Sequence, residues 1–375
     1  MTINVSKRQT RAGRYERQST GYSAFIPAPL PPKPPIQVSG RLQSLLSTAD
    51  RALGRLDGSV QTLPNPDLFV MMYVRKEAVL SSQIEGTQSS LQDLLAAEAD
   101  VLPREGIARD VDEVVNYVAA MKHGIERLEK LPISVRLVRE IHARLMQDAR
   151  GGRLTPGELR RSQNWIGPAG STIATASFIP PPADVVPEAL SQLERFLHTT
   201  DEIPLLIRIG LAHAQFETIH PFLDGNGRVG RLLITFLLCE QKVLHQPVLY
   251  LSHFLKQHRA EYYDRLQAVR LDGDWEAWLA FFLRGVAEVS DQAVETARRI
   301  LVMREQHRTA IARTLGRAAG NGHLVLEHLF ERPIISVADV VVLLGSTFTA
   351  ASNVVNRFED LGLLVEITGY ARNRR

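Results

Sequence analysis

Twelve residues, His220 to Arg231 (HPFLDGNGRVGR), combine the residue types that bind phosphate groups and act on them. They include a histidine, an aspartate, two glycines around an asparagine, and two arginines three residues apart. A hairpin turn is the simple alternative, because Asp-Gly and Asn-Gly are common hairpin signals. However, the segments IRIGLAHAQFETIH and RVGRLLITFLLCEQK on either side carry apolar residues at helical spacing. The pattern therefore predicts a helix, a loop and a second helix.

A glycine-containing loop that opens a helix predicts an anion site. The first N–H groups of a helix have no partner within it, and the helix dipole adds positive potential there. Gly225 and Gly227 let the backbone approach a phosphate closely. Arg228 and Arg231 share one face of the first turn and would reach neighbouring phosphates. These four residues indicate a cradle for a phosphate chain.

Two further side chains of the loop add chemistry to this cradle. The carboxylate of Asp224 suits Mg²⁺ that bridges two phosphates. A neutral imidazole at His220 would accept a proton from an incoming hydroxyl. The segment therefore predicts a nucleoside-triphosphate site with a general base beside it.

The segment resembles the core motif of Fic-domain proteins, H-x-F-x-[D/E]-G-N-G-R-x-x-R, at every specified position. Eight specified positions occur together by chance on the order of 10⁻¹⁰ per start site. The resemblance implies a protein adenylyltransferase, which moves AMP from ATP to a Ser, Thr or Tyr hydroxyl of a target protein or of itself. Transfer of another phosphate-containing group is an alternative. No Walker or kinase signature suggests a second nucleotide site.

The resemblance also implies a role for each matched residue. These are the general base His220, the buried anchor Phe222, the Mg²⁺ ligand Asp224, the α-phosphate site of Asn226 with the amides of Gly225 and Gly227, and the β- and γ-phosphate clamps Arg228 and Arg231. ATP is then the substrate and Mg²⁺ the cofactor.

A second stretch, SSQIEG at residues 81–86, resembles the inhibitory motif [S/T]-x-x-x-E-[G/N] of the same family through Ser81, Glu85 and Gly86. The resemblance implies that Glu85 pairs bidentately with Arg231 and keeps it from the γ-phosphate. The alternative is an ordinary solvated glutamate on a helix.

Other stretches fit the same fold. Residues 164–182 read as a hairpin of two short β-prone pieces around a turn, followed by a proline stop. GELRRSQNWIG and FIPPP resemble the family's segment ahead of the flap hairpin and the flap itself, which aligns the target peptide as an added strand. Residues 258–278 resemble the region that closes over adenine in the family, which implies that Tyr262 or Tyr263 stacks there, with core packing as the alternative. His213 lies seven residues before His220, and we interpret it as a packed helix histidine rather than a metal ligand.

The elements that must position these residues are mainly α-helical, because apolar residues recur at three- and four-residue spacings through most of the 375-residue chain. We expect a flexible basic and proline-rich segment at 1–40, a helical region with the inhibitory motif at 41–130, and a Fic core at 131–288. A linker helix and a winged helix-turn-helix follow at 289–375.

The C-terminal unit raises the alternative of a DNA-binding transcriptional regulator. Its candidate recognition helix, residues 349–361, offers one arginine, Arg357, against Glu359 and Asp360. That face suits phosphates poorly, so a protein-docking or homodimer role is favoured over DNA.

Composition places few limits on partners. The formal net charge is only +3, although both ends are basic. The chain has no apolar signal core and no apolar run long enough to cross a bilayer, so we expect a cytoplasmic protein without a membrane partner. The single cysteine, Cys239, excludes an internal disulfide and reads as an inert core thiol.

Overall fold

The computed structural model describes residues 9–63, 66–99, 108–147, 155–168, 170–199 and 203–369. Within them the chain is mainly helical, as predicted, with one three-stranded antiparallel sheet. The strands are β1 (Gln9–Thr10), β2 (Gly13–Arg17) and β3 (Ser23–Pro27). The helices are α1 (Gly40–Gln61), α2 (Pro66–Ile84), α3 (Leu91–Glu98), α4 (Ala108–Leu128), α5 (Val135–Leu145), α6 (Val186–His198), α7 (Leu205–Ile219), α8 (Asn226–Glu240), α9 (Ser252–Gln257), α10 (Arg259–Asp272), α11 (Trp275–Leu315), the 3₁₀ turn η2 (Gly316–Ala318), α12 (Ala319–Glu331), α13 (Val337–Leu344) and α14 (Phe348–Asp360).

The N-terminal sheet corrects one expectation. Residues 1–40 were expected to be flexible, but 9–27 form the sheet in the order β1, β2, β3. Phe25 on β3 is fully buried, and its ring centroid lies 6.0 Å from that of Phe178. Its N–H donates to the carbonyl of Ile179 at 3.0 Å. The sheet therefore packs against the segment expected to form the flap.

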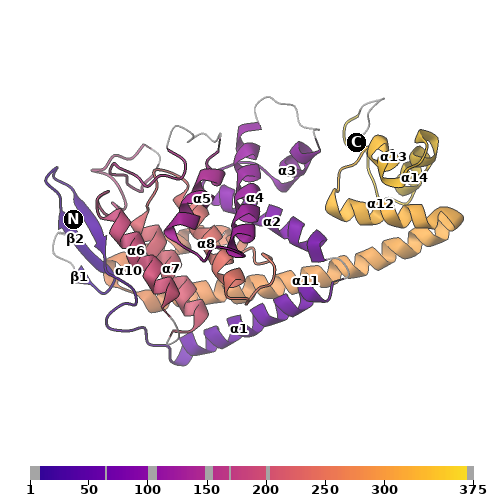
Figure 1. Ribbon diagram of the computed structural model, residues 1–375. Helices are drawn as coiled ribbons and strands as arrows, with labels where there is room; N and C mark the ends of the chain where they lie inside the picture. Colours follow the sequence, from indigo (N-terminus) through magenta and orange to yellow (C-terminus); the bar gives the residue numbers. More distant parts are fainter. Residues whose placement is uncertain are drawn as a thin grey trace.

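Helices α7 and α8 lie inside the helical body and carry the loop between them (Figure 1). Both are buried on nearly every face, which explains their continuous apolar sequences. The long helix α11 runs beside α1. One hydrophobic core holds buried residues from Ala12 to Ala297, so the N-terminal helices and the segment 131–288 form one packed unit. The expected boundary at 288–289 falls inside α11, which continues from this body into the C-terminal unit.

The C-terminal unit has a small core of its own, built from residues between Ile311 and Phe358. The three expected helices are present as α12, α13 and α14. Residues 363–369 carry no assigned strand, and 370–375 lie outside the described residues, so the wing stays a prediction. In the described part of the chain no single helix is long and apolar enough to cross a membrane, and the bent pair α13 and α14 passes that test only by length and composition.

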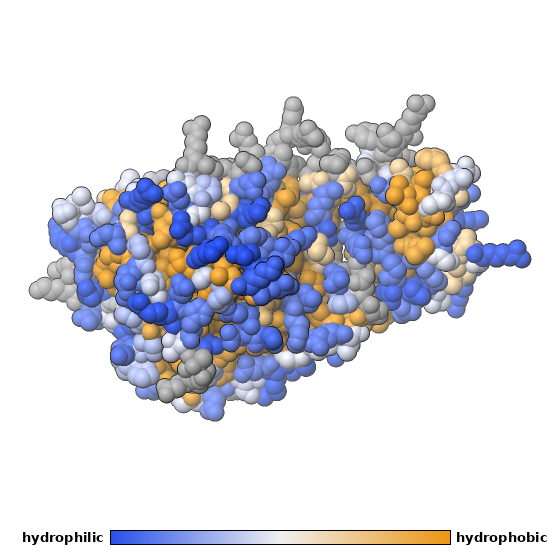
Figure 2. Space-filling model, in the orientation of Figure 1, coloured by the Kyte–Doolittle hydropathy of each residue, from blue (hydrophilic) through white to orange (hydrophobic). Residues whose placement is uncertain are grey.

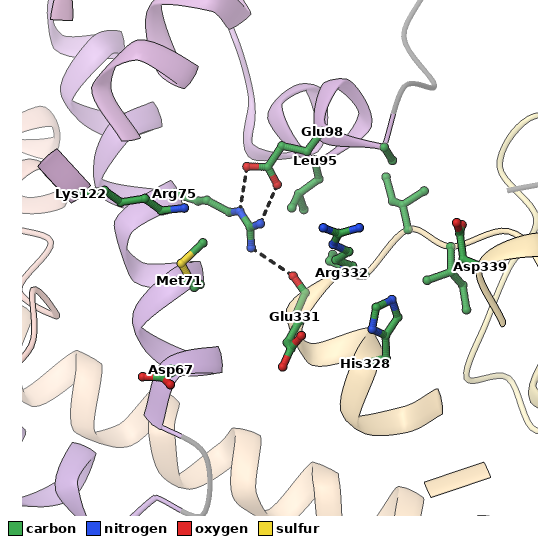
Figure 3. A pocket seen from close by; sticks show the side chains of 14 residues that line it. Asp67, Met71, Arg75, Leu95, Glu98, Lys122, His328, Glu331, Arg332 and Asp339 are labelled. Atoms are coloured by element: carbon green, nitrogen blue, oxygen red, sulfur yellow. Dashed lines mark hydrogen bonds and ion pairs between the residues drawn. The ribbon is translucent and has the colours of Figure 1, made fainter. Parts of the chain in front are cut away.

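Helix α2 touches the C-terminal unit through Arg75 (Figure 3). The guanidinium binds both carboxylate oxygens of Glu98, at 3.1 and 2.6 Å, and donates to the carbonyl of Glu331 at 3.2 Å. Glu331 is the last residue of α12, where a cation is favourable because it faces the negative end of the helix dipole. A cavity of about 570 Å³ with a largely charged lining lies beside this contact. The helix that leads into the predicted inhibitory motif is therefore tied to the C-terminal unit.

Candidate functional site

The loop between α7 and α8 is held in shape by its own residues. His220 ends α7 with φ of 49°, and Gly225 precedes α8 with φ of 76°. This positive φ at Gly225 favours glycine, and a Cβ there would also lie 2.8 Å from the sulfur of Met146. The side chain of Asn226 accepts from the N–H of Phe222 at 2.8 Å and donates to its carbonyl at 2.9 Å. Phe222 is fully buried, as predicted. The amide of Asn226 therefore builds the loop, and its contact with an α-phosphate stays a prediction.

Two side chains outside the motif support the loop, and no spacing in the sequence indicates either of them. The Nδ1 of His142 accepts from the N–H of Gly157 at 2.8 Å, so its Nε2 carries the proton and donates to the carbonyl of Asp224 at 3.1 Å. The imidazole of His142 stacks on Phe222 with centroids 3.7 Å apart. Asn164 donates to the Phe222 carbonyl at 2.9 Å. Burial lowers the pKa of His142 to about 4, which keeps this ring neutral.

The imidazole of His220 is neutral at pH 7. Burial lowers the pKa of His220 to about 3, and the positive charges of Arg270 and Arg160 act in the same direction. Arg160 also donates from Nε to the His220 carbonyl at 2.9 Å. Within the described residues the Nδ1 of His220 is buried and makes no hydrogen bond. A neutral ring can accept a proton without first losing one, which suits the expected general base.

The carboxylate of Asp224 fits a single protein ligand for Mg²⁺. The residue is exposed, and its Oδ1 accepts from the N–H of Gly225 at 2.6 Å, beside the start of α8. No group of three or more His, Cys, Asp or Glu that would hold a metal occurs in the described ranges. Mg²⁺ usually keeps several waters and binds one or two carboxylates together with substrate phosphates. The donor set therefore suits an ion that arrives with a nucleotide.

Arg231 is buried and bound to the end of α2, as the inhibitory motif predicts. Its Nε donates to the Oγ of Ser81 at 2.8 Å, and its Nη2 donates to the Ser81 carbonyl at 3.0 Å and to Oε1 of Glu85 at 2.7 Å. The expected bidentate pair is wrong, because one nitrogen reaches one carboxylate oxygen and Ser81 takes the other contacts. Burial acts to lower the pKa of Arg231, but nearby acidic groups, Glu85 first among them, raise it above its ordinary value.

The carboxylate of Glu85 also covers the start of α8. A Cβ on Gly227 would lie 2.3 Å from Oε1 of Glu85 and 3.0 Å from Nη1 of Arg231. A carboxylate at this end of a helix faces the positive end of the helix dipole. Glu85 therefore stands where an anionic ligand would lie, and its side chain remains 37% exposed, at the mouth of the site.

Arg228 is held by a carboxylate that the sequence analysis missed. Its Nη1 donates to Oε2 of Glu113 on α4 at 3.1 Å, and the two side chains are only 4% and 14% exposed. The hydroxyl of Thr87, two residues after Glu85, donates to the same oxygen at 3.4 Å. Each motif arginine is thus bound to a glutamate from the N-terminal helical region, and Thr87 links the two contacts. Glu113 carries no sequence signal beyond being a glutamate in a helical pattern.

The structure separates the two candidate tyrosines. Tyr262 is buried, and its hydroxyl donates to Nε2 of His213 at 2.8 Å, so adenine stacking is wrong for Tyr262 and the core-packing alternative holds. The Nδ1 of His213 donates to the Gly230 carbonyl at 3.0 Å, which confirms a packed helix histidine. Tyr263 is 37% exposed. Burial raises the pKa of Tyr263 to about 12, and the nearby Glu85 acts in the same direction. Tyr263 therefore lies beside the site and remains the candidate for adenine.

The expected flap, residues 164–182, is a loop closed by one antiparallel bridge rather than by two strands in its described part. Ile166 donates to the carbonyl of Phe178 at 2.8 Å, and Phe178 donates back at 3.1 Å. The proline stop that follows lies beside His220, because Arg160 donates to the carbonyl of Pro181 as well as to that of His220. The flap and the loop of the motif are therefore neighbours.

Two family profiles match this chain. Residues 43–126 match the profile described as Fic/DOC family N-terminal, and residues 132–238 match the Fic/DOC family profile. The two matches together span about half of the chain and include both the Ser81–Gly86 stretch and the loop with His220.

Curated relatives and a solved structure agree with these profiles. "Protein adenylyltransferase Fic" of Drosophila erecta is 27% identical over 215 residues, which are 56% of this chain and 37% of that protein. The Drosophila melanogaster protein of the same name is 26% identical over 269 residues, 68% of this chain and 47% of that protein. The chain thus spans less than half the length of these relatives. A Fic family protein from Desulfovibrio desulfuricans G20 shares the fold, with a TM-score of 0.61 and 22% identity over 91% of this chain and 96% of that one.

Proposed function

Because this chain belongs to the Fic/DOC family, we propose that it is a protein adenylyltransferase that transfers AMP from ATP to Ser, Thr or Tyr hydroxyls of target proteins and of itself. The observation that carries the proposal is a neutral, half-buried His220 in the loop that leads into a helix start with two arginines. We further propose that the chain is held inactive by the contact of Glu85 with Arg231.

The residues of the site support transfer of AMP from ATP directly to the target hydroxyl. The target hydroxyl oxygen attacks the α-phosphorus, its proton passes to His220, and the bond between the α-phosphorus and the bridging oxygen breaks to release pyrophosphate. Arg228 and Arg231 neutralise the charge on the β- and γ-phosphates, and the N–H groups at the start of α8 do so at the α-phosphate. Asp224 would hold Mg²⁺, which supplies further charge neutralisation across the phosphates.

Position-specific labelling tests this function. The pure protein is incubated with a lysate and ATP labelled first on the α-phosphate and then on the γ-phosphate. We expect protein-bound label from the α-position only. Label from the γ-position would instead show transfer of a phosphate and would overturn the proposal.

Removal of the Asp224 carboxylate tests the Mg²⁺ ligand. We expect Asp224→Ala to lower α-label transfer about a hundredfold, because the lost oxygen orients the ion as well as holding it. For the same reason, excess Mg²⁺ should restore little of the activity. A titration of activity against Mg²⁺ measures both effects. Unchanged activity at low Mg²⁺ would show that the ion is held elsewhere.

The contact of Glu113 with Arg228 predicts a second constraint on the phosphate site. In a Glu85→Gly background we expect Glu113→Gln to raise α-label transfer about fivefold, because the amide holds Arg228 more weakly than the carboxylate does. Asp112→Asn, an exposed neighbour on α4, is the control. Lower transfer in Glu113→Gln but not in the control would mean that Glu113 orients Arg228 for the phosphate.

The C-terminal unit supports a second candidate activity, the docking of a protein. Figure 2 shows apolar residues at the surface of this unit, and its exposed large apolar side chains include Val342 and Phe348, at 82% and 65%. Such residues favour a target protein or a second copy of the chain over DNA, because DNA binding requires basic side chains.

We also propose a cytoplasmic location for this protein.

A further inference from the structure

Arg270 is a buried arginine outside the motif, on α10. It is 6% exposed, and the hydrogen-bond partners that the structure gives it are uncharged. Its Nε donates to the hydroxyl of Thr218 at 3.2 Å, its Nη2 to the carbonyl of Glu217 at 3.3 Å and its Nη1 to the side chain of Gln267 at 3.4 Å. Two of these contacts fall on the last turn of α7, which His220 ends. Arg270 therefore fixes the turn that positions the predicted base.

The other side of Arg270 faces the flap. Its guanidinium carbon lies 3.9 Å from the ring centroid of Phe178, within cation–π distance. Phe178 forms the bridge that closes the flap, and its ring packs on Phe25 of the N-terminal sheet. One side chain thus joins the base of the flap to the end of α7.

The charge of Arg270 needs an explanation of its own. A buried cation costs desolvation energy, and an apolar side chain of the same size would fill the space at lower cost. Burial lowers the pKa of Arg270 only to about 10, because the nearby Glu217 carboxyl acts in the opposite direction, so the cation persists at neutral pH. A retained charge at this point therefore indicates a role beyond packing.

We propose that Arg270 is a positioning residue for the transfer reaction, which holds the flap in register with the turn that carries His220. This inference rests on the proposed function, because the flap matters only if it guides a target polypeptide to the base. Arg160 also joins the loop to the end of the flap, because it donates hydrogen bonds to the carbonyls of His220 and Pro181.

The same geometry makes the protonation of His220 depend on Arg270. The charged groups around the imidazole are Arg270 from α10 and Arg160 from the segment before the flap, and both lower its pKa. Glu217 on α7 is buried, and burial raises the pKa of its carboxyl to about 7. Loss of the Arg270 charge leaves Arg160 as the remaining cation, so the imidazole pKa moves upward.

The test uses the full chain with Arg270→Met, Arg270→Lys and the control Arg265→Met, which changes a more exposed arginine on the same helix. Each is measured in the Glu85→Gly background with α-labelled ATP and the protein itself as acceptor. We expect Arg270→Met to lower the maximal rate on the order of tenfold while half-saturating ATP stays nearly unchanged. As the pH is lowered, the activity of Arg270→Met should be lost at a higher pH than that of its Glu85→Gly parent, because the pKa of His220 is higher. Arg270→Lys keeps the charge and should restore the pH profile but not the full rate.

Two measurements on Arg270→Met do not depend on transfer activity. NMR without nucleotide follows the imidazole pKa of His220, and hydrogen exchange follows the Ile166 and Phe178 amides. We expect Arg270→Met to raise that pKa and to weaken the protection of both amides. If the His220 pKa and the amide protection in Arg270→Met both match those in the Arg265→Met control, the inference is overturned. A lower unfolding temperature of Arg270→Met would not change that conclusion. If the Glu85→Gly parent transfers no α-label, the proposed function fails, while exchange and NMR still decide the role of Arg270.

Discussion

Glu85→Gly is expected to raise α-label transfer, including self-modification, by about one to three orders of magnitude. The change removes the 2.7 Å contact with Arg231 and clears the carboxylate from the start of α8. Arg231 is then free to leave Ser81 for a γ-phosphate, and ATP can bind in a productive pose. The Glu85 side chain is 37% exposed, so solvent screening limits the gain. Even so, each 1.36 kcal/mol of released stabilisation is a tenfold change in rate.

Initial rates with α-labelled ATP measure this gain. Glu129→Gly is a matched control, because Glu129 is an exposed glutamate in the turn after α4, as Glu85 lies in the turn after α2. The double change Glu85→Gly with Arg231→Ala should lose the gain, since the released partner is absent. Wild-type transfer in Glu85→Gly at unchanged ATP affinity would make Glu85 an ordinary surface glutamate.

His220→Ala is expected to abolish transfer in the Glu85→Gly background while ATP affinity stays nearly intact. The imidazole meets the incoming hydroxyl, whereas the phosphates are held by the start of α8 and by the arginines. General-base catalysis contributes roughly 10²–10⁴-fold, so the residual rate should fall by at least that factor.

Single-turnover labelling and ATP titration separate the two effects. Thermal unfolding serves as the control, because His220 is half-buried with a buried Nδ1, and its truncation removes packing at the end of α7. If ATP affinity falls together with transfer while the unfolding temperature is unchanged, the assignment of His220 as the base is refuted.

The N-terminal sheet shows where sequence reasoning was insufficient. The segment 9–27 is short, largely polar and followed by prolines, so we expected it to be flexible. It instead forms three strands that pack on the flap. Strand pairing depends on partners and on burial that local composition does not report. Phe25 is buried partly against Phe178, which lies far along the chain.

Local pattern determined the helices, the loop with its helix start, and the two motifs. Each depends on spacing within a few turns, and the pairing of Glu85 with Arg231 was expected from the resemblance of both motifs to one family, whereas the contacts of Ser81 with Arg231 were not. Tertiary structure alone decided which side chains surround them. Glu113 lies 115 residues from Arg228 and His142 lies 82 from Asp224, and no period in the sequence links such pairs. Burial decided the rest, because tertiary packing makes Tyr262 a core residue and, together with Arg270 and Arg160, lowers the pKa of His220.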